Sequence, residues 1–486
     1  MIGLGIGLGF IKSPFIPTRQ RVTETQARVE GKPLYTGTVR YVSSTGNNSN
    51  TGLDPALPKL TIGSAYSASS HGDIIQLLSN MDMANEAGGA LLLNTADKGV
   101  LIRGTVGNPS AITITQTNGT PNYSIRLGAS NLMQFQSITF TTSFTKVQIS
   151  CLSNNVGATN KAWFKFKDCN FTGTNPAAIN GYCFNPSSNL VTDTADKFYE
   201  FDGCTFTLTN NTGTFQPIYM AYNSLTTTWL FNNCSWVTTG FTSFWHDDKN
   251  KSKCCLYDCN FTQSYGQLAV AFGSNTAVPD NTGMIVDVRS TTITINTGYD
   301  PHGFLFGRGT NSVYAVNNNV YIPTTSSANA IGFVIKTTSA SLGQNYFGGN
   351  YVEAPEVYLF KGCQYVDFQY NSGLCNYYQN GSLTVYNTVE ADAPTGIPCT
   401  GCRVLYNNLI GYARGITISP TTATIKGATS MQGWTMDYNV YYGEGNVYIY
   451  NQQNSTAYYL SARTSFWSGS QDANSQMVTT REIYNP

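Results

Sequence analysis

Apolar and polar residues alternate in short runs along most of this chain, and Gly, Asn, Asp and Ser separate the runs. Runs of period two predict β-strands whose side chains point alternately to a core and to solvent. A helical spacing occurs only near the start, where Ile62, Ala65 and Tyr66 share one face. We therefore expect a strand at 35–43, then a short amphipathic helix that ends near Gly72.

One six-residue pattern recurs through most of the chain: an apolar residue, two turn-type residues, Cys or Asn, a variable residue, and an aromatic or aliphatic residue. The fourth residue of each copy serves as its marker. The markers, looser copies included, are Ile138, Cys169, Cys204, Cys234, Cys259, Thr291, Asn319, Asn350, Asn371, Asn408 and Asn439. Their spacing averages about 30 residues, which predicts a solenoid of stacked coils with two or three strands each.

The pattern also predicts what fills the inside of the solenoid. Strand side chains alternate, so the marker and the residue two places later point the same way. We expect a column of cysteines, continued by asparagines that hydrogen-bond from coil to coil, beside a column of aromatic residues. The predicted interior residues are Cys169, Cys204, Cys234 and Cys259 in the first column and Phe171, Phe206, Trp236 and Phe261 in the second.

Charge and hydropathy exclude some classes of function. Only 11% of the residues are charged, and 27 basic residues balance 27 acidic ones. Without a basic stripe, nucleic acid is not an expected partner. No apolar run reaches the eighteen or so residues of a membrane-spanning helix, so we expect a soluble protein with no membrane span.

At both ends, from Tyr41 to the C-terminus, the sequence resembles the pectate-lyase-like family of right-handed parallel β-helix proteins. The residues that carry the resemblance are Tyr41-Val-Ser-Ser-Thr-Gly46, Gly52, Pro58, Thr61-Ile62, Ala65, His71-Gly-Asp-Ile-Ile75, Asp437-Tyr-Asn-Val-Tyr-Tyr442, Phe466-Trp467, Gln471-Asp-Ala-Asn-Ser475 and Tyr484-Asn-Pro486. The resemblance implies an all-β, right-handed parallel β-helix with an N-terminal cap helix. It does not imply one activity, because lyases, hydrolases, epimerases and binding spikes share this fold.

The first residues form a separate segment, a Gly-apolar tip followed by a polar stretch. Its opening, Met1-Ile-Gly-Leu-Gly5, is similar to the start of tail and capsid-associated proteins of phages that infect Bacteroidetes. The resemblance implies a virion protein, commonly a homotrimer, with a docking tail at 1–34 and a β-helix at 35–486. The expected anchoring residues are Ile2, Leu4, Ile6, Leu8 and Phe10. A secretory signal remains the alternative interpretation of the apolar tip, with a secreted protein as its consequence.

Catalytic chemistry has few candidates. Cleavage of an acidic polysaccharide by elimination needs a basic residue and usually a carboxylate cluster that holds calcium, and the sequence has no such cluster. The nearest group is Trp245, His246, Asp247 and Asp248, in an insertion between the Cys234 and Cys259 coils. Either it is a solvated loop, or Trp245 contacts sugar and an Asp acts as acid or base.

Other acidic and cysteine groups favour structural roles. Asp168, Asp202 and Asp258 could supply paired carboxyls for hydrolysis, but Asn and Gly fill equivalent places in other coils, which favours turn formation. A further loop candidate consists of Asp300, His302 and Arg308. Four cysteines late in the chain match no strong zinc spacing, so we expect buried free thiols, no metal and no cofactor. These four are Cys363, Cys375, Cys399 and Cys402.

Surface tyrosines could stack on sugars, with Tyr377 and Tyr378 as the first candidates and Tyr441 and Tyr442 as others. Together these observations predict a phage spike or fibre on the particle surface that recognises host-surface polysaccharide. Whether it is an enzyme stays open. The alternatives are a polysaccharide lyase or glycoside hydrolase on the same fold, and a purely architectural capsid protein.

Overall fold

The chain is a right-handed parallel β-helix in the computed structural model, which confirms the predicted fold class. The predicted boundary between 1–34 and 35–486 lies at the edge of the described residues and stays a prediction. The structure describes residues 35–93, 95, 98–117, 123–127, 132–142, 147–150, 162–175, 184–185, 197–210, 219–221, 227–239, 242–247, 253–266, 268–273, 284–298, 301–307, 310–323, 330–337, 344–376, 381–387, 399–411, 414–420, 434–442, 447–451, 456–459 and 474–477.

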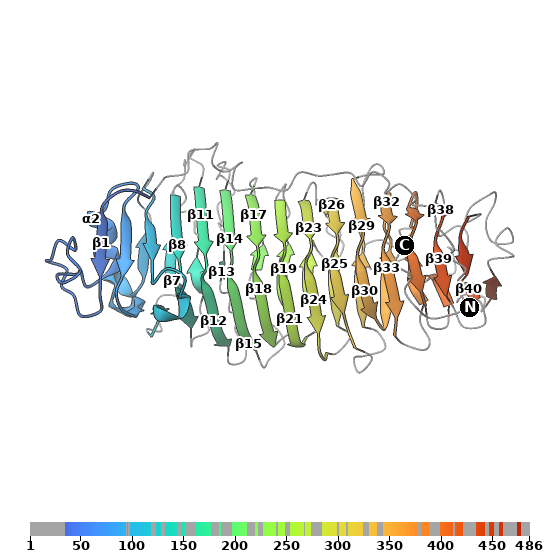
Figure 1. Ribbon diagram of the computed structural model, residues 1–486, viewed down its shortest axis with the longest axis horizontal. Helices are drawn as coiled ribbons and strands as arrows, with labels where there is room; N and C mark the ends of the chain where they lie inside the picture. Colours follow the sequence, from blue (N-terminus) through green and yellow to red (C-terminus); the bar gives the residue numbers. More distant parts are fainter. Residues whose placement is uncertain are drawn as a thin grey trace, which may run out of the picture. The chain divides into compact units, whose positions relative to one another are not determined.

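Parallel strands from successive coils lie side by side in three faces (Figure 1). Within the described residues the first sheet has 14 strands, hydrogen-bonded in chain order. They are β1 (Val39–Val42), β2 (Ile74–Leu77), β5 (Leu101–Arg103), β8 (Leu132–Gln136), β11 (Ala162–Lys167), β14 (Lys197–Asp202), β17 (Thr227–Asn232), β20 (Lys253–Tyr257), β23 (Met284–Arg289), β26 (Thr310–Val316), β29 (Asn345–Gly348), β32 (Val366–Gln369), β35 (Arg403–Leu405) and β38 (Thr435–Asp437).

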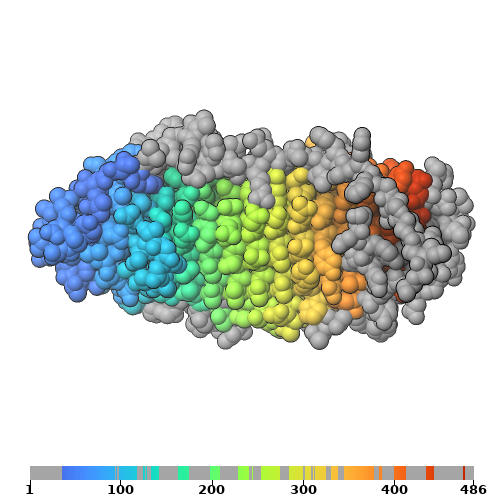
Figure 2. Space-filling model, in the orientation of Figure 1, coloured from blue at the N-terminus to red at the C-terminus, as the bar shows by residue number. Residues whose placement is uncertain are grey.

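The second sheet repeats this order with the next strand of each coil. Its described strands are β3 (Met81–Asp82), β6 (Thr113–Thr115), β9 (Thr139–Thr142), β12 (Asn170–Asn175), β15 (Thr205–Asn210), β18 (Ser235–Thr239), β21 (Asn260–Tyr265), β24 (Thr292–Ile295), β27 (Asn319–Tyr321), β30 (Tyr351–Ala354), β33 (Ser372–Cys375), β36 (Asn408–Ile410), β39 (Val440–Tyr442) and β42 (Gln476–Met477). Figure 2 shows the coils as successive bands of colour, so neighbouring surface residues come from neighbouring coils.

The third face consists of two sheets, and only its last pairing is antiparallel within the described strands. The first of these sheets contains β4 (Leu91–Leu93), β7 (Tyr123–Leu127), β10 (Val147–Ser150) and β13 (Phe184–Asn185). The second contains β16 (Tyr219–Ala221), β19 (Thr242–Asp247), β22 (Leu268–Phe272), β25 (His302–Phe306), β28 (Ile331–Ile335), β31 (Glu356–Lys361), β34 (Gly381–Asn387), β37 (Arg414–Pro420), β40 (Val447–Asn451) and β41 (Thr456–Tyr459).

The predicted cap helix is α2 (Ile62–Ala68), which buries the three residues that its spacing indicated. The side chain of Thr61 caps it by accepting a hydrogen bond from the Ser64 N–H. Glu86 adds a second cap, because its carboxylate accepts bonds from the first two N–H groups of α2 at 2.7 and 3.0 Å. Glu86 lies between two short 3₁₀ turns, Met83–Asn85 and Ala87–Gly89; a third such turn is Pro109–Ala111.

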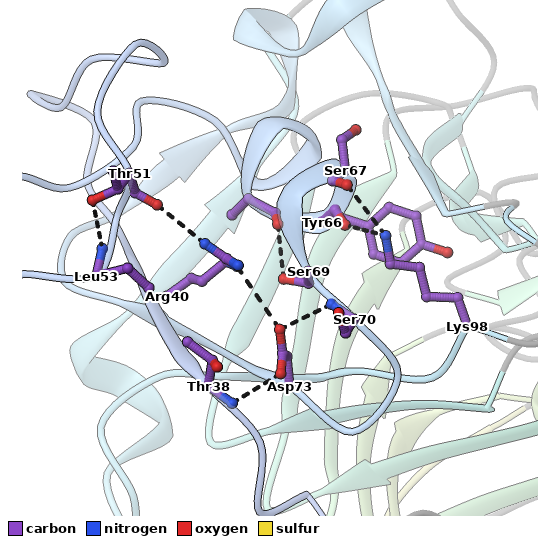
Figure 3. Close-up of polar contacts among 11 residues, drawn as sticks. Thr38, Arg40, Thr51, Leu53, Tyr66, Ser67, Ser69, Ser70, Asp73 and Lys98 are labelled. Carbon is purple, nitrogen blue, oxygen red and sulfur yellow. Dashed lines mark hydrogen bonds and ion pairs between the residues drawn. The ribbon is translucent and has the colours of Figure 1, made fainter.

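Polar contacts around Asp73 hold the first coil to this cap (Figure 3). The Asp73 carboxylate accepts hydrogen bonds from the Thr38 N–H at 2.8 Å and the Ser70 N–H at 2.9 Å, and it lies 3.8 Å from the Arg40 guanidinium. Lys98 donates to the carbonyl of Tyr66 and lies 4.5 Å from the centre of its ring. These bonds satisfy backbone groups where the stack of coils begins.

Two columns of parallel aromatic rings fill the interior of the coils between β8 and β21. Ring planes within a column are at most 16° apart, and centroids are 4.2 to 5.2 Å apart. One column is Phe135, Phe166, Phe201 and Phe231, and the other is Phe140, Phe171, Phe206, Trp236 and Phe261. The second column confirms the predicted aromatic residues, and offset stacking adds to the burial of each ring.

The predicted marker column is also interior, and its cysteine half is confirmed, since all four thiols are at most 1% exposed. Cys204, Cys234 and Cys259 donate to the carbonyls of Phe166, Phe201 and Phe231, one coil earlier, at 3.3 to 3.7 Å. The asparagine half forms the predicted ladder, with amide-to-amide bonds of 2.8 to 3.1 Å. Its members are Asn318, Asn350, Asn371, Asn407 and Asn439.

Two predicted markers are wrong by one residue: the column contains Asn318 and Asn407, and not Asn319 and Asn408. Adjacent asparagines made two registers equally consistent with the repeat. Because side chains alternate along a strand, a shift of one residue moves a side chain to the other face. Asn319 therefore begins β27 with its side chain partly exposed, whereas Asn318 is fully buried.

No helix in the described part of the chain is both long and apolar enough to span a membrane.

Candidate functional site

The structure describes only part of the predicted site. The backbone of Trp245, His246 and Asp247 lies in β19, paired with β16 and β22. These three residues therefore belong to a strand of the third face, and the expectation of a solvated loop is wrong for them. Asp248 and the side chains of its three predecessors lie outside the description, as do Tyr377, Tyr378, and the anchoring residues Ile2, Leu4, Ile6, Leu8 and Phe10.

Other predicted residues have clear places. Asp168 and Asp258 have φ values of 50° and 55°, in the left-handed region, which confirms their role in turns. Asp202 ends β14 and accepts a hydrogen bond from the Asn232 amide at 3.1 Å. Tyr441 is fully buried in the second sheet, so it is not a surface tyrosine that could contact sugar.

The turn between the first and second sheets carries a group of tyrosines that sequence reasoning missed. In eleven successive coils, the residue before the interior column has a positive φ, and in the first eight it is Ser, Asp, Gly or Asn. In the last three it is Tyr370, Tyr406 and Tyr438, with φ values of 58°, 58° and 55°. We call these three residues the tyrosine ladder. Its repeat would have been visible in the sequence with the correct register of Asn407.

The rings of the tyrosine ladder stack on one another. Centroids are 5.0 Å apart between Tyr370 and Tyr406 and 4.9 Å apart between Tyr406 and Tyr438, with planes 4° and 12° apart. Tyr438 is 46% exposed and the other two are partly exposed. Burial and the neighbouring Tyr406 raise the pKa of Tyr370 to about 12, so this phenol stays protonated at neutral pH.

Tyrosine is an unusual residue for this turn. A bulky side chain at positive φ costs about 1 to 3 kcal/mol, whereas Gly and Asn adopt this conformation more readily. Each stacked pair contributes about 0.5 to 1.5 kcal/mol, and the ladder has two such pairs for three strained positions. Stacking and the partial burial of the rings both offset this cost. Because tyrosine is nevertheless retained at positive φ in three successive coils, a role in binding is worth testing.

A neutralised ion pair lies beside the ladder. Arg403 donates through Nε to Asp367 at 3.0 Å and also contacts this carboxylate through Nη2, and the Gln369 amide donates to the same group. Asp367 is buried, but the Arg403 side chain is 38% exposed. Hydrogen bonding to Asp367 raises the pKa of Arg403, which stays charged. The exposed surface thus combines phenols with a guanidinium whose charge is already compensated.

Two other acidic residues on the outward side of the first sheet are also paired with basic side chains, as Asp367 is with Arg403. Glu200 pairs with Lys165 at 2.9 Å, and Asp287 pairs with Arg289 while accepting from the Tyr257 hydroxyl at 3.0 Å. The carboxylates of Glu200, Asp287 and Asp367 are at most 3% exposed, whereas Asp202 and Asp437, at the ends of β14 and β38, are partly exposed.

The carboxylates of Glu200, Asp287 and Asp367 are too far from one another to act as the catalytic pair of a glycoside hydrolase. Register places Asp287 three coils after Glu200 and Asp367 three coils after Asp287. Three strand spacings amount to roughly 14 Å, whereas paired catalytic carboxyls of glycosidases lie about 5 to 10 Å apart. These particular carboxylates therefore do not form such a pair.

The late cysteines meet at one corner of the solenoid. The sulfur of Cys363 lies 3.7 Å from that of Cys399 and 4.0 Å from that of Cys402, and all three are buried. Cys375 lies elsewhere and donates to the Pro355 carbonyl at 3.1 Å. The ten cysteines that the structure describes are free thiols, and burial raises the pKa of Cys363 well above its ordinary value. Among the described residues, no group of three or more His, Cys, Asp or Glu is arranged to hold a metal ion.

In comparisons with known proteins, no protein-family model and no curated protein matches the chain.

Proposed function

We propose that this chain is a structural protein of a phage particle, a spike or fibre whose β-helix recognises glycans on the host surface. In this proposal residues 1–34 attach it to the particle, and the spike is a homotrimer. The observation that carries the proposal is the tyrosine ladder: one exposed and two partly exposed aromatic side chains are held in a strained conformation on a stack of coils. Aromatic side chains with a hydroxyl suit sugars because they offer both an apolar ring and a polar group.

Three carboxylates on the outward side of the first sheet are held in a state that suits binding better than bond cleavage. A general acid or base must exchange a proton with the substrate. The carboxylates of Glu200, Asp287 and Asp367 are instead buried and paired with cations. A polysaccharide-degrading enzyme on this fold is the alternative, and its catalytic groups would then lie among other residues, such as Asp247 and Asp248.

The first test incubates the purified full-length protein with polysaccharide from the host surface and follows both binding and chain length over time. The proposal expects bound polysaccharide of unchanged length. Shortened chains would instead identify a depolymerase, and Asp247→Asn and Asp248→Asn would then show whether these residues act in it. Absence of binding would overturn glycan recognition.

The second test concerns attachment to the particle. Phage that carry the gene without the codons for residues 1–34 should assemble particles that lack this protein, measured by mass spectrometry of purified virions. Light scattering of the full-length protein should give three times the mass of one chain. Incorporation without residues 1–34 would contradict the anchoring role of this segment.

A further inference from the structure

Resting on the proposed function, we infer that the tyrosine ladder binds a neutral, extended glycan chain that runs along the solenoid axis with one sugar unit per coil. The inference concerns Tyr370, Tyr406 and Tyr438 and the ion pair of Arg403 and Asp367 beside them. Three features lead to it: the repeat distance of the ladder, the edge at which the ladder begins, and the absence of a free cation among the charged groups described beside it.

The repeat distance points to a polymer that lies along the axis. The three rings recur at intervals of 5.0 and 4.9 Å, one ring for each coil. Because neighbouring rings cover one another's faces, a ligand that repeats at a similar interval can contact the outward edge of each ring in turn. One pyranose unit of an extended, β-linked chain has a length close to this interval. A chain that crossed the solenoid at a right angle would meet only one ring.

The ladder begins at a clear edge, because the preceding coil has Gly349 at the same place in the turn. One face of Tyr370 therefore has no equivalent ring next to it, while Tyr438, at the other end, is the most exposed of the three. The site thus spans three coils. A chain of three sugar units would contact the whole ladder.

Charge around the ladder favours a neutral ligand. Recognition of a carboxylate or phosphate usually requires a cation that is free to pair with it. Arg403 is already paired with Asp367. The Asp437 carboxylate, held by two hydrogen bonds from Asn474 at 2.7 and 2.6 Å, would repel an anionic ligand. The Tyr406 and Tyr438 hydroxyls can both donate and accept hydrogen bonds, as the hydroxyl groups of a neutral sugar do, whereas the Tyr370 hydroxyl is buried and this residue offers only its ring.

The test uses full-length protein and calorimetry with size-fractionated fragments, one to eight sugars long, of the host-surface polysaccharide. Affinity should rise with fragment length up to three sugars and then level off. The variant Tyr370→Asn/Tyr406→Asn/Tyr438→Asn should lose at least tenfold in affinity, with Tyr406→Asn the largest single loss. Asparagine is chosen because Asn233 and Asn317 already occupy this turn in other coils, so the variant should fold.

A matched control is Tyr321→Asn, which changes a tyrosine that is 39% exposed on the second sheet, away from the ladder. It should bind like the wild type. Circular dichroism and melting temperature will verify that each variant is folded. Affinity should also change less than twofold between low and high salt, because a neutral ligand forms no screened ion pairs.

The outcomes separate this inference from the proposed function. If the folded triple variant binds host polysaccharide as tightly as the wild type, the glycan site lies elsewhere, and the inference is overturned while the spike proposal stands. If affinity falls steeply with salt, the ligand is charged and the inference is wrong about its class. If the wild type binds no host polysaccharide, the proposed function fails, and the inference fails with it.

Discussion

Coils with cysteine in the interior turn column and coils with asparagine there satisfy the same row of backbone carbonyls by different means. Cys234 donates its thiol to the Phe201 carbonyl at 3.4 Å, and Asn350 donates its amide to the equivalent Ala315 carbonyl at 2.9 Å. Asn350 does more, because its side-chain oxygen also accepts bonds from the backbone and side-chain N–H groups of Asn318. The asparagine coils are therefore linked into one polar chain.

The two regions also differ in how their cores are packed. Rings of the third face meet the core edge to face in both regions, as Phe244 meets Phe231 at 86° and Phe306 meets Phe347 at 81°. The long parallel columns, however, lie between β8 and β21. In the cysteine region, apolar burial and ring stacking carry the stability. In the asparagine region, a hydrogen-bonded ladder accompanies smaller apolar side chains. The same position of the coil thus holds either a cysteine or an asparagine, and substitutions in each region can test the comparison.

The largest effect is expected at the aromatic columns. Trp236 stacks between Phe206 and Phe261, with centroids 4.8 and 4.2 Å away. Trp236→Ala should lower the free energy of unfolding by about 4 kcal/mol, because it leaves a large cavity. Trp236→Phe should cost only about 1 kcal/mol, since the column already accepts phenylalanine in neighbouring coils. Urea unfolding followed by circular dichroism measures both, and equal losses would show that ring stacking is not the important interaction.

The asparagine ladder should give the next effect. The Asn371 side chain accepts two hydrogen bonds from Asn350 and donates to Asn407 and to the Phe347 carbonyl. Asn371→Ala should cost about 3 kcal/mol, because buried polar partners on both sides lose their bonds. The control Thr207→Ala changes an exposed residue and should stay within about 0.5 kcal/mol of the wild type. A loss as small as that of the control would contradict a cooperative ladder.

The interior columns could largely be predicted from the sequence, because buried residues recur at a regular spacing along each strand and from coil to coil. The pattern around Cys169 and Cys204 fixed the interior side of the strands, and Phe171 and Phe206 followed by alternation. The register failed where asparagines are adjacent, at Asn318 and Asn407, because nothing local distinguishes the two places.

The candidate site was harder to predict. Buried residues recur in the sequence at a regular spacing, whereas the conformation of a turn is compatible with many residue types. Tyr370, Tyr406 and Tyr438 occupy a place where small, turn-forming residues are expected, and a search for turns passes over tyrosine. Pairing of Asp367 with Arg403 depends on which residues of adjacent coils face each other, so it required the register. Exposed aromatic residues could be suspected from composition, but their position could not.

A single cysteine should matter less than a single asparagine. Cys234→Ala removes the thiol contacts with the Phe201 and Asn232 carbonyls and with its two neighbouring thiols, and it leaves a small cavity. Cys204 and Cys259 keep their own carbonyl partners. We expect a loss of about 1 to 2 kcal/mol. The same urea unfolding experiment, run beside Asn371→Ala, measures the difference. Equal losses for the two variants would mean that the thiols are linked as cooperatively as the amides.

The smallest expected effect is a difference between the cysteine column and the asparagine column in how stability depends on pH. Burial raises the pKa of the Cys169 and Cys234 thiols well above the ordinary value of 9.0. Above pH 9 these thiols lose protons in the unfolded chain but not in the folded one, so the folded state binds more protons and stability falls as pH rises. Each such thiol should lower the free energy of unfolding by about 1 kcal/mol between pH 9 and pH 10.

Asparagine has no proton to lose, so its column should not contribute to this loss of stability. Cys234→Ala should therefore flatten the fall in stability between pH 8 and pH 10, and Asn371→Ala should leave its slope unchanged. Unfolding curves in urea at half-unit steps of pH measure the slope. The pH range stops at 10 because burial also raises the pKa of tyrosines such as Tyr358 above the ordinary value of 10.0. Above pH 10 these tyrosines would also make stability fall as pH rises. A Cys234→Ala slope equal to that of the wild type would show that the Cys234 thiol does not contribute to the loss of stability at alkaline pH.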